Sequence, residues 1–296
     1  MDDVREDVAD YLGECMAVDA GLVVLLQRLE EIGELDNSLV VVSGDHGIPG
    51  FPRAKCNLYD IGCEVALAAR WPGRIPAGRT IDDFVNLMDL APTFLDACEV
   101  AVPGSMTARS LLPMLTGDGD GQVEADRTFV VTGRECHVHM ARDGFLPYPQ
   151  RAIRTRDHLY IHNFAPDRWP AGDPCGLDDP AAPAPAYDDL GTNTHVCYAD
   201  LDASPTKAWM IHHRMEEEVR APFQLGFGKR PKEELYDLRV DRHYMNNVAN
   251  DLAYRDIQEE LAATLMQVLR ENNDPRVVEA PCRFEHKPFA GPFPVA

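Results

Sequence analysis

A carboxylate and an imidazole stand side by side at Asp45 and His46, directly after the apolar run 39–42. This β-branched run, ended by a glycine, predicts a strand buried on both faces. Open α/β sheets place their ligand sites at the carboxyl ends of such strands, where Asp45 and His46 could bind one divalent cation. The ammonium group of Lys55, nine residues after His46, could hold an anion near that cation. The structural alternative is a solvated turn capped by the aspartate.

The chain carries a strong negative charge, which limits its partners. Its 296 residues include 49 acidic and 28 basic side chains, for a formal net charge of −21. Long-range repulsion from this charge disfavours binding to nucleic acids and to anionic membrane surfaces. The sequence predicts neither a transmembrane segment nor a signal peptide, since its amino terminus is acidic and its apolar runs are short, and it leaves the location open. An anionic substrate would therefore need local cations.

Hydrophobic periodicity predicts an α/β fold in two parts. In the first part, residues 1–127, helix and strand patterns occur at 7–33, 39–42, 64–70, 86–98 and 109–115. The second part, residues 128–296, follows a turn-rich break and has strand signals at 128–132, 152–155, 159–163 and 233–238. We expect a smaller antiparallel sheet there, covered by an amphipathic helix at 251–269 and followed by a Pro-rich tail.

The order of the motifs is more specific than any single one. After SGDHG at 43–47 come WPG at 71–73, DLAPT at 89–93 and SLLPMLTG at 110–117. This order resembles the second half of a sulfatase, a family of the alkaline-phosphatase-like superfamily. The resemblance covers most of residues 5–275 and implies the carboxyl-terminal part of that fold, with residues 1–127 contributing to its α/β core.

The resemblance also implies roles for the three polar residues. Asp45 and His46 would bind the metal that polarises the sulfate, and Lys55 would contact a sulfate oxygen. Sulfatases usually carry Asp-Asn at this position and bind calcium. Calcium is therefore the expected metal, with manganese as the alternative, because the imidazole of His46 suits manganese, iron or zinc better. Related phosphonate and phosphodiester hydrolases also use Asp-His, so a metal-dependent hydrolase of that kind is an alternative.

A narrower resemblance lies in the second part of the chain. It rests on TGRECH at 132–137, YPQRAIRT at 148–155 and RPKEELYDL at 230–238. These motifs are similar to those of the heparan N-sulfatase branch, which cleaves N-sulfate from glucosamine at the ends of heparan chains. The resemblance makes Arg134, Glu135 and His137 candidates for binding a sulfated saccharide substrate.

One required part of a sulfatase is not found in this sequence. The family's nucleophile is a formylglycine made from the cysteine of a Cys-x-Pro/Ala-x-Arg motif, and none of the eight cysteines stands in one. The early Asp-Asp metal pair of the family has no counterpart either. We therefore expect a fragment whose partner is a missing amino-terminal half, and which is inactive alone. The alternative is a non-catalytic remnant or binding module.

Overall fold

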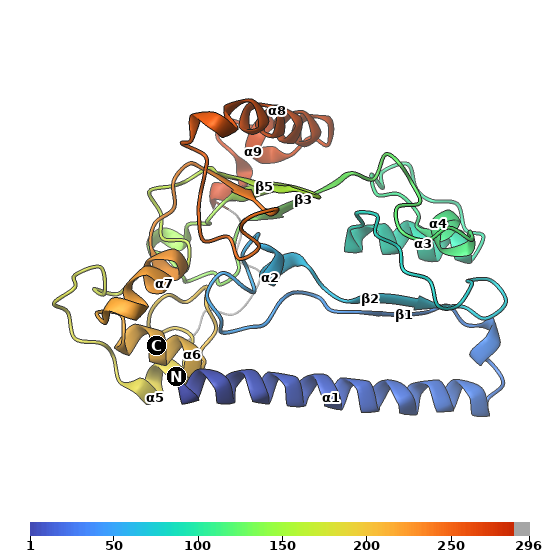
Figure 1. Cartoon of the computed structure of the whole chain (residues 1–296), viewed down its shortest axis with the longest axis horizontal. Coiled ribbons are helices and arrows are strands. Elements are labelled where there is room, and N and C mark those ends of the chain that lie inside the picture. Colours follow the sequence, from blue (N-terminus) through green and yellow to red (C-terminus); the bar gives the residue numbers. More distant parts are fainter. Residues whose placement is uncertain (287–296) are drawn as a thin grey trace. The chain divides into compact units, whose positions relative to one another are not determined.

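The computed structural model describes residues 1–286 (Figure 1). These residues divide into two compact units. Unit 1 contains Met1–Asp7, His46–Glu64 and the described chain from Val131 on, and unit 2 contains Val8–Asp45 and Val65–Val130. One passage of the chain from unit 2 into unit 1 thus falls between Asp45 and His46. The division of the sequence at residues 127 and 128 stays a prediction.

The strand predicted at 39–42 is present in unit 2, but it is not buried on both faces. Strand β1 (Val40–Ser43) pairs antiparallel with β2 (Leu67–Arg70), with Val41 opposite Ala69. In the described chain these two strands form a sheet by themselves, and β1 is half-buried at most. The expectation of a buried central strand is therefore wrong, because a two-stranded ribbon leaves each strand one unpaired edge and too little cover.

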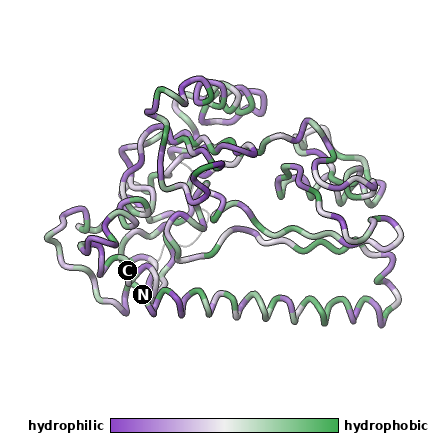
Figure 2. The backbone as a smooth tube through the Cα atoms, viewed as in Figure 1, coloured by the Kyte–Doolittle hydropathy of each residue, from purple (hydrophilic) through white to green (hydrophobic). Residues whose placement is uncertain are grey.

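Helix α1 (Asp2–Glu31) confirms the helix predicted at 7–33. Figure 2 shows apolar and polar positions alternating along it, as expected for an amphipathic helix. None of its residues is buried, and Met16 is 74% exposed. A short 3₁₀ turn, η1 (Leu35–Asn37), leads from α1 to β1. No helix of the described chain is long and apolar enough to span a membrane.

The DLAPT motif of unit 2 has a structural role. It forms the turn η2 (Leu87–Asp89) and the start of α3 (Leu90–Ala97), close to α4 (Leu112–Thr116). The buried Asp89 carboxylate accepts from the backbone N–H of Arg109 at 3.1 Å and from Nη1 of Arg127 at 2.9 Å. These bonds fasten residues 109 and 127 to the start of α3.

Unit 1 contains the antiparallel sheet predicted for the second part of the chain. Its strands, in spatial order, are β3 (Phe129–Arg134), β4 (Gln150–Thr155), β5 (His158–Asn163) and β6 (Glu233–Asp237), and only the first two residues of β3 belong to unit 2. Helix α8 (Arg255–Glu271) packs on β4 and β5 and buries Leu261, Leu265 and Leu269. The expected sheet covered by a late helix is confirmed.

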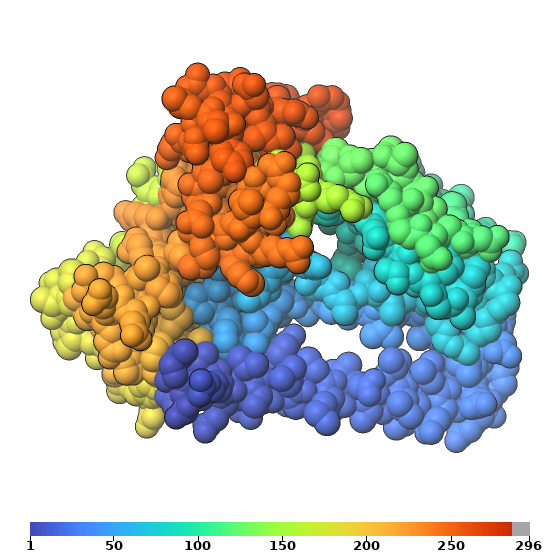
Figure 3. All heavy atoms as spheres, viewed as in Figure 1, coloured from blue at the N-terminus to red at the C-terminus, as the bar shows by residue number. Residues whose placement is uncertain are grey.

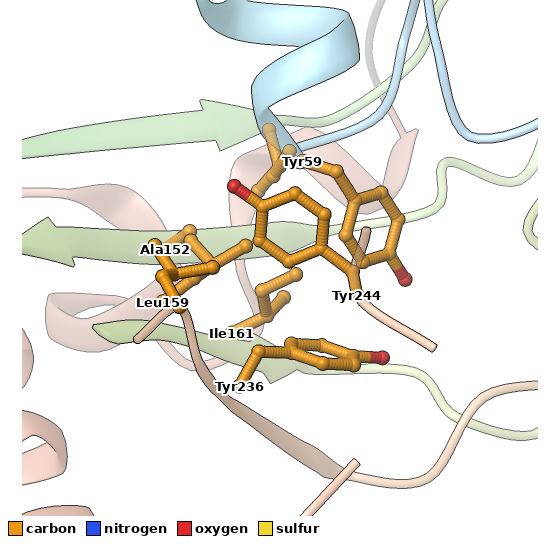
Figure 4. Packing of buried hydrophobic residues seen from close by; sticks show 8 residues of the cluster. Tyr59, Ala152, Leu159, Ile161, Tyr236 and Tyr244 are labelled. Atoms are coloured by element: carbon orange, nitrogen blue, oxygen red, sulfur yellow. The ribbon is translucent and has the colours of Figure 1, made fainter. Parts of the chain in front are cut away.

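Segment 46–64 is anchored to this sheet by aromatic packing (Figure 4). The ring of Tyr59 packs against Tyr236, with centroids 5.9 Å apart, and its hydroxyl donates to Glu234 at 2.7 Å. The guanidinium group of Arg53 lies 3.7 Å from the centroid of the Tyr59 ring. This packing fixes the segment that carries His46 and Lys55 relative to β5 and β6.

A second hydrophobic cluster holds the helical part of unit 1 together. It joins residues from the Pro-rich stretch 165–195, such as Leu177 and Leu190, to Tyr198, Ile211 and Phe227. The helices involved are α5 (Tyr187–Thr192), α6 (Pro205–His212) and α7 (Glu217–Phe227), yellow to orange in Figure 3. The remaining short elements are α2 (Asp60–Cys63), η3 (Asp143–Phe145), η4 (Leu252–Tyr254), α9 (Pro275–Val278) and η5 (Arg283–His286).

Candidate functional site

One closed loop of unit 1 carries His46 and Lys55. The backbone N–H of Lys55 donates to the carbonyl of Ile48 at 3.3 Å. Gly47 is required next to Ile61, since a Cβ on Gly47 would lie 1.7 Å from the carbonyl oxygen of Ile61. Nδ1 of His46 lies 2.8 Å from the carbonyl oxygen of Gly47 and must donate, because a carbonyl only accepts. In the neutral tautomer that this bond favours, the lone pair is on Nε2, the nitrogen suited to a metal ion.

Lys55 and His137 converge on one carboxylate, that of Asp202, and we call these three residues the Lys55 cluster. Nζ of Lys55 donates to Oδ2 of Asp202 at 2.8 Å, and Nε2 of His137 lies 3.8 Å from Oδ1. The side chains of Lys55, Asp202 and His137 are 22, 27 and 29% exposed, so a small ligand can reach them. The cluster joins a cation, a carboxylate and an imidazole at the surface of unit 1.

The imidazole of His137 is held in its neutral form. Burial lowers the pKa of His137 below its ordinary value, and Lys55 and Arg134 add to the effect, while Asp200 and Asp202 oppose it. At pH 7 the ring therefore has one N–H donor and one lone pair. It can donate to or accept from a ligand without adding a charge.

Asp200, two residues before Asp202, is buried between two guanidinium groups. Its Oδ2 accepts from Nη2 of Arg134 at 2.6 Å and from Nη2 of Arg142 at 2.5 Å, and its Oδ1 accepts from the backbone N–H of Val138. Burial by itself raises the pKa of Asp200, but the two arginines outweigh it and hold the pKa below its usual value. Arg134 thus ties the end of β3 to the loop that carries Asp202.

Glu135 belongs to a different group of ion pairs. Its carboxylate accepts from Arg151 at 2.8 Å and from Arg276 at 2.6 Å. Arg151 also pairs with Asp274 at 2.6 Å. These contacts join β3 and β4 to the chain beyond α8. The structure therefore brings His137, but not Glu135, to Lys55.

The loop before α6 brings Asp202 to Lys55 through two anchors. Ser204 caps α6 by accepting from the backbone N–H of Lys207 at 3.0 Å, and its hydroxyl donates to the carbonyl of Gly50 at 2.8 Å. The fully buried ammonium group of Lys207 donates to three backbone carbonyls, the shortest at 2.9 Å to Leu201. Burial lowers the pKa of Lys207 to about 8.

Replacing Gly50 with alanine tests the first anchor. Gly50 has φ +74°, and a Cβ there would lie 2.4 Å from Cβ of Ser204. We expect a loss of about 2–4 kcal/mol in the free energy of unfolding, from backbone strain plus overpacking. Gly176→Ala is the matched control, since Gly176 also has a positive φ (+93°) but no atom near the added Cβ. Urea denaturation measures both, and equal losses would contradict the anchor.

Acidification tests the neutral imidazoles. Burial lowers the pKa values of His137, His158 and His162. The unfolded chain then binds protons more readily than the folded chain. The stability that the neutral imidazoles contribute is therefore fully present above about pH 6.5, and it is lost as the pH falls through their lowered folded-state pKa values. We expect a lower melting temperature at pH 5.5 than at pH 7.5, and a smaller difference in the variant His137→Gln. An unchanged difference in that variant would contradict the assignment for His137.

The sequence-based metal ligands supply only part of a coordination shell. In residues 1–286, no group of three or more His, Cys, Asp or Glu side chains is placed to hold a metal ion. Asp45 is the last residue of its segment of unit 2 and His46 the first of its segment of unit 1. The pair offers one carboxylate and one Nε2 atom, fewer donors than a divalent cation normally takes.

Comparisons with known proteins show a similarity to sulfatases. Residues 45–168 match the family description N-sulphoglucosamine sulphohydrolase, C-terminal. The chain is 28% identical to the human N-sulphoglucosamine sulphohydrolase over 92% of its own length and 49% of that protein. It is 26% identical to an ulvan-active sulfatase of Formosa agariphila, over 83% of the chain and 41% of that protein.

A solved structure agrees with these relatives. It is a protein in complex with its substrate D-glucosamine-2-N,6-O-disulfate, with a TM-score of 0.60 and 25% identity, over 91% of this chain and 42% of that one. The chain thus spans about half the length, or less, of the proteins it matches. The chain is therefore similar to sulfatases, and the family description that it matches is that of a carboxyl-terminal region.

Proposed function

We propose that this chain is the carboxyl-terminal part of a sulfatase that removes sulfate from a sulfated glucosamine, with the N-sulfate as the first candidate. The observation that carries the proposal is the convergence of Lys55 and His137 on Asp202. A solvent-accessible ammonium group beside a neutral imidazole can bind one sulfate oxygen by charge and a second polar atom by hydrogen bonding.

Each predicted residue has a place in this proposal. Lys55 contacts a non-bridging sulfate oxygen, and His137 contacts the sulfate or a sugar hydroxyl. Arg134 holds the Asp202 loop through Asp200, while Glu135 remains a predicted sugar contact. Asp45 and His46 supply two ligands for a divalent cation, which when bound would neutralise charge developing on the sulfate. The remaining ligands and the formylglycine would come from an amino-terminal half.

The identity of the metal follows from the ligand types. Calcium is the usual metal of the family, whereas the imidazole of His46 favours manganese over calcium. We expect the replacement His46→Asn to raise the activity with calcium relative to that with manganese in the complete enzyme. A ratio that does not change would remove His46 from the metal site.

A second candidate function is that of a non-catalytic module that binds sulfated saccharides. It is favoured by one observation, namely that none of the eight cysteines stands in the Cys-x-Pro/Ala-x-Arg motif. Such a module would still bind sulfated glucosamine through the Lys55 cluster, and would do so without hydrolysis.

The deciding experiment measures binding and sulfate release on the same sample. We expect the chain alone to bind N-sulfoglucosamine at millimolar concentrations in an NMR titration and to release no sulfate above background with calcium or manganese. Co-expression with an amino-terminal half that carries formylglycine should restore release. Binding without restored release favours the module, and absence of binding contradicts both candidates.

A further inference from the structure

Unit 1 contains a cavity that the Lys55 cluster does not use. Its volume is about 470 Å³, within the range of natural small-molecule sites. Its lining includes four aromatic residues, Trp169, Tyr198, Phe223 and Phe227. Tyr198 and Phe227 are buried, whereas polar residues such as Gln224 lie at an exposed rim. The cavity therefore has an apolar, buried floor and a polar, solvent-exposed entrance.

The aromatic walls are held in place by one another. The rings of Phe223 and Phe227 stack with centroids 4.7 Å apart, and Tyr198 packs against Phe227 at 4.8 Å. Trp169 is half-buried, and the ammonium group of Lys229 lies 5.1 Å from the centroid of its ring. A rigid aromatic surface of this kind suits the apolar face of a flat or chair-shaped ring.

The residues that line the cavity include a buried arginine, Arg214, with an unused donor. Arg214 is 6% exposed and donates from Nη1 to the carbonyl of Ile211 at 2.9 Å and from Nη2 to that of Ala182 at 2.5 Å. Its buried Nε–H has no hydrogen-bond partner in the described chain. A buried donor without a partner costs about 1–3 kcal/mol, which an acceptor oxygen on a ligand would recover.

The charges on the lining favour an anion. Arg214 and Arg220 provide two positive charges, and Asp178 provides one negative charge. This local excess of positive charge contrasts with the net charge of −21 of the whole chain. Asp178 and Gln224 add rim groups that can hydrogen bond to hydroxyls.

We propose that this cavity binds an anionic monosaccharide unit, that is, a sugar ring that carries one sulfate or carboxylate. The ring lies against the aromatic walls, the anionic group reaches Arg214 and Arg220, and its hydroxyls meet Asp178 and Gln224. This assignment does not depend on hydrolysis or on the metal. The inorganic anion alone lacks the ring, and a neutral sugar lacks the charge, so neither should bind well.

The cavity is linked to the Lys55 cluster through shared backbone. Arg142 donates to the carbonyl of Trp169 at 2.7 Å and also pairs with Asp200. Tyr198 lines the cavity four residues before Asp202. The two sites therefore share a backbone connection through Arg142 and the chain 198–202, although they use different side chains.

Tryptophan fluorescence of the full chain tests the proposal, since Trp169 lines the cavity. We expect a saturable change with N-sulfoglucosamine or glucuronate, and none with inorganic sulfate or glucose at equal concentration. Arg220→Gln, at the exposed rim, should weaken this binding about tenfold, and Trp169→Phe should remove most of the signal. Arg255→Gln is the control, because Arg255 is exposed and lies outside both sites, and it should leave the signal unchanged.

Three outcomes would overturn the assignment. The first is no saturable change with either anionic sugar. The second is loss of the signal in Lys55→Gln with retention in Arg220→Gln, which would place the ligand at the Lys55 cluster. The third is equal affinity for phenyl sulfate, which would make the cavity a site for aromatic anions. Because Arg220 is exposed, its replacement should leave the fold intact.

Discussion

Replacing Asp200 with alanine should destabilise unit 1 by about 3–5 kcal/mol, the usual cost of removing one partner from a buried ion pair. The side chain of Asp200 is 1% exposed, and its removal leaves the guanidinium groups of Arg134 and Arg142 without their shared counter-ion. The backbone N–H of Val138 loses its acceptor as well. Urea denaturation followed by hydrogen exchange of β4 and β5 measures the loss.

Asp202→Ala is the matched control for this experiment. Asp202 lies in the same loop, but its side chain is 27% exposed and pairs with Lys55, which is 22% exposed. Partly exposed ion pairs contribute about 1 kcal/mol or less. Similar losses for the two variants would show that Asp200 is not the structural centre of the loop.

Sequence patterns predicted the strands and helix α8 of unit 1, because these depend on local periodicity, but they did not predict helices α5, α6 and α7. The apolar face of α8 recurs at helical spacing, and the hairpin β4–β5 has a strong β pattern around residues 156–157. The same reasoning failed for β1. An apolar run indicates that a strand tends to be buried, but tertiary structure decides which elements cover it. In the described chain, β1 pairs only with β2.

Two members of the Lys55 cluster were already candidates from the sequence, and their roles stay predictions. Lys55 and His137 stood in recognisable motifs, so their chemistry was visible in the sequence. Asp202 was not assigned, because an aspartate among 49 acidic residues carries no signal of its own. Only the fold shows that the bond between Ser204 and Gly50 brings its loop to Lys55. Likewise, Arg134 pairs with Asp200, 66 residues later, and Glu135 pairs with Arg276, 141 residues later. Hydrophobic periodicity reports only local structure and cannot predict such long-range pairs.

Charge changes at Lys55 and Asp202 should move the affinity for sulfated glucosamine in opposite directions. Lys55→Gln removes the cation that would contact the sulfate, and we expect the affinity to fall about tenfold, or about 1.4 kcal/mol. Asp202→Asn removes the carboxylate that now lies 2.8 Å from the ammonium group of Lys55 and competes with the incoming anion. In that variant the affinity should rise about threefold to tenfold.

The direction of the affinity change in Asp202→Asn separates an electrostatic role of Asp202 from a structural one. If Asp202 chiefly positioned Lys55 and His137, its replacement by asparagine would weaken binding, as the lysine variant does. If it competes for the ammonium group, the asparagine variant binds more tightly, and the gain shrinks as salt screens the remaining charges. NMR titrations with N-sulfoglucosamine at 20 and 200 mM salt (roughly 20 and 7 Å of Debye length) measure both effects. Weaker binding in both single variants would contradict competition between Asp202 and the ligand for Lys55, and would leave Asp202 as a positioning residue. The double variant, which lacks both charges, should bind no better than Lys55→Gln.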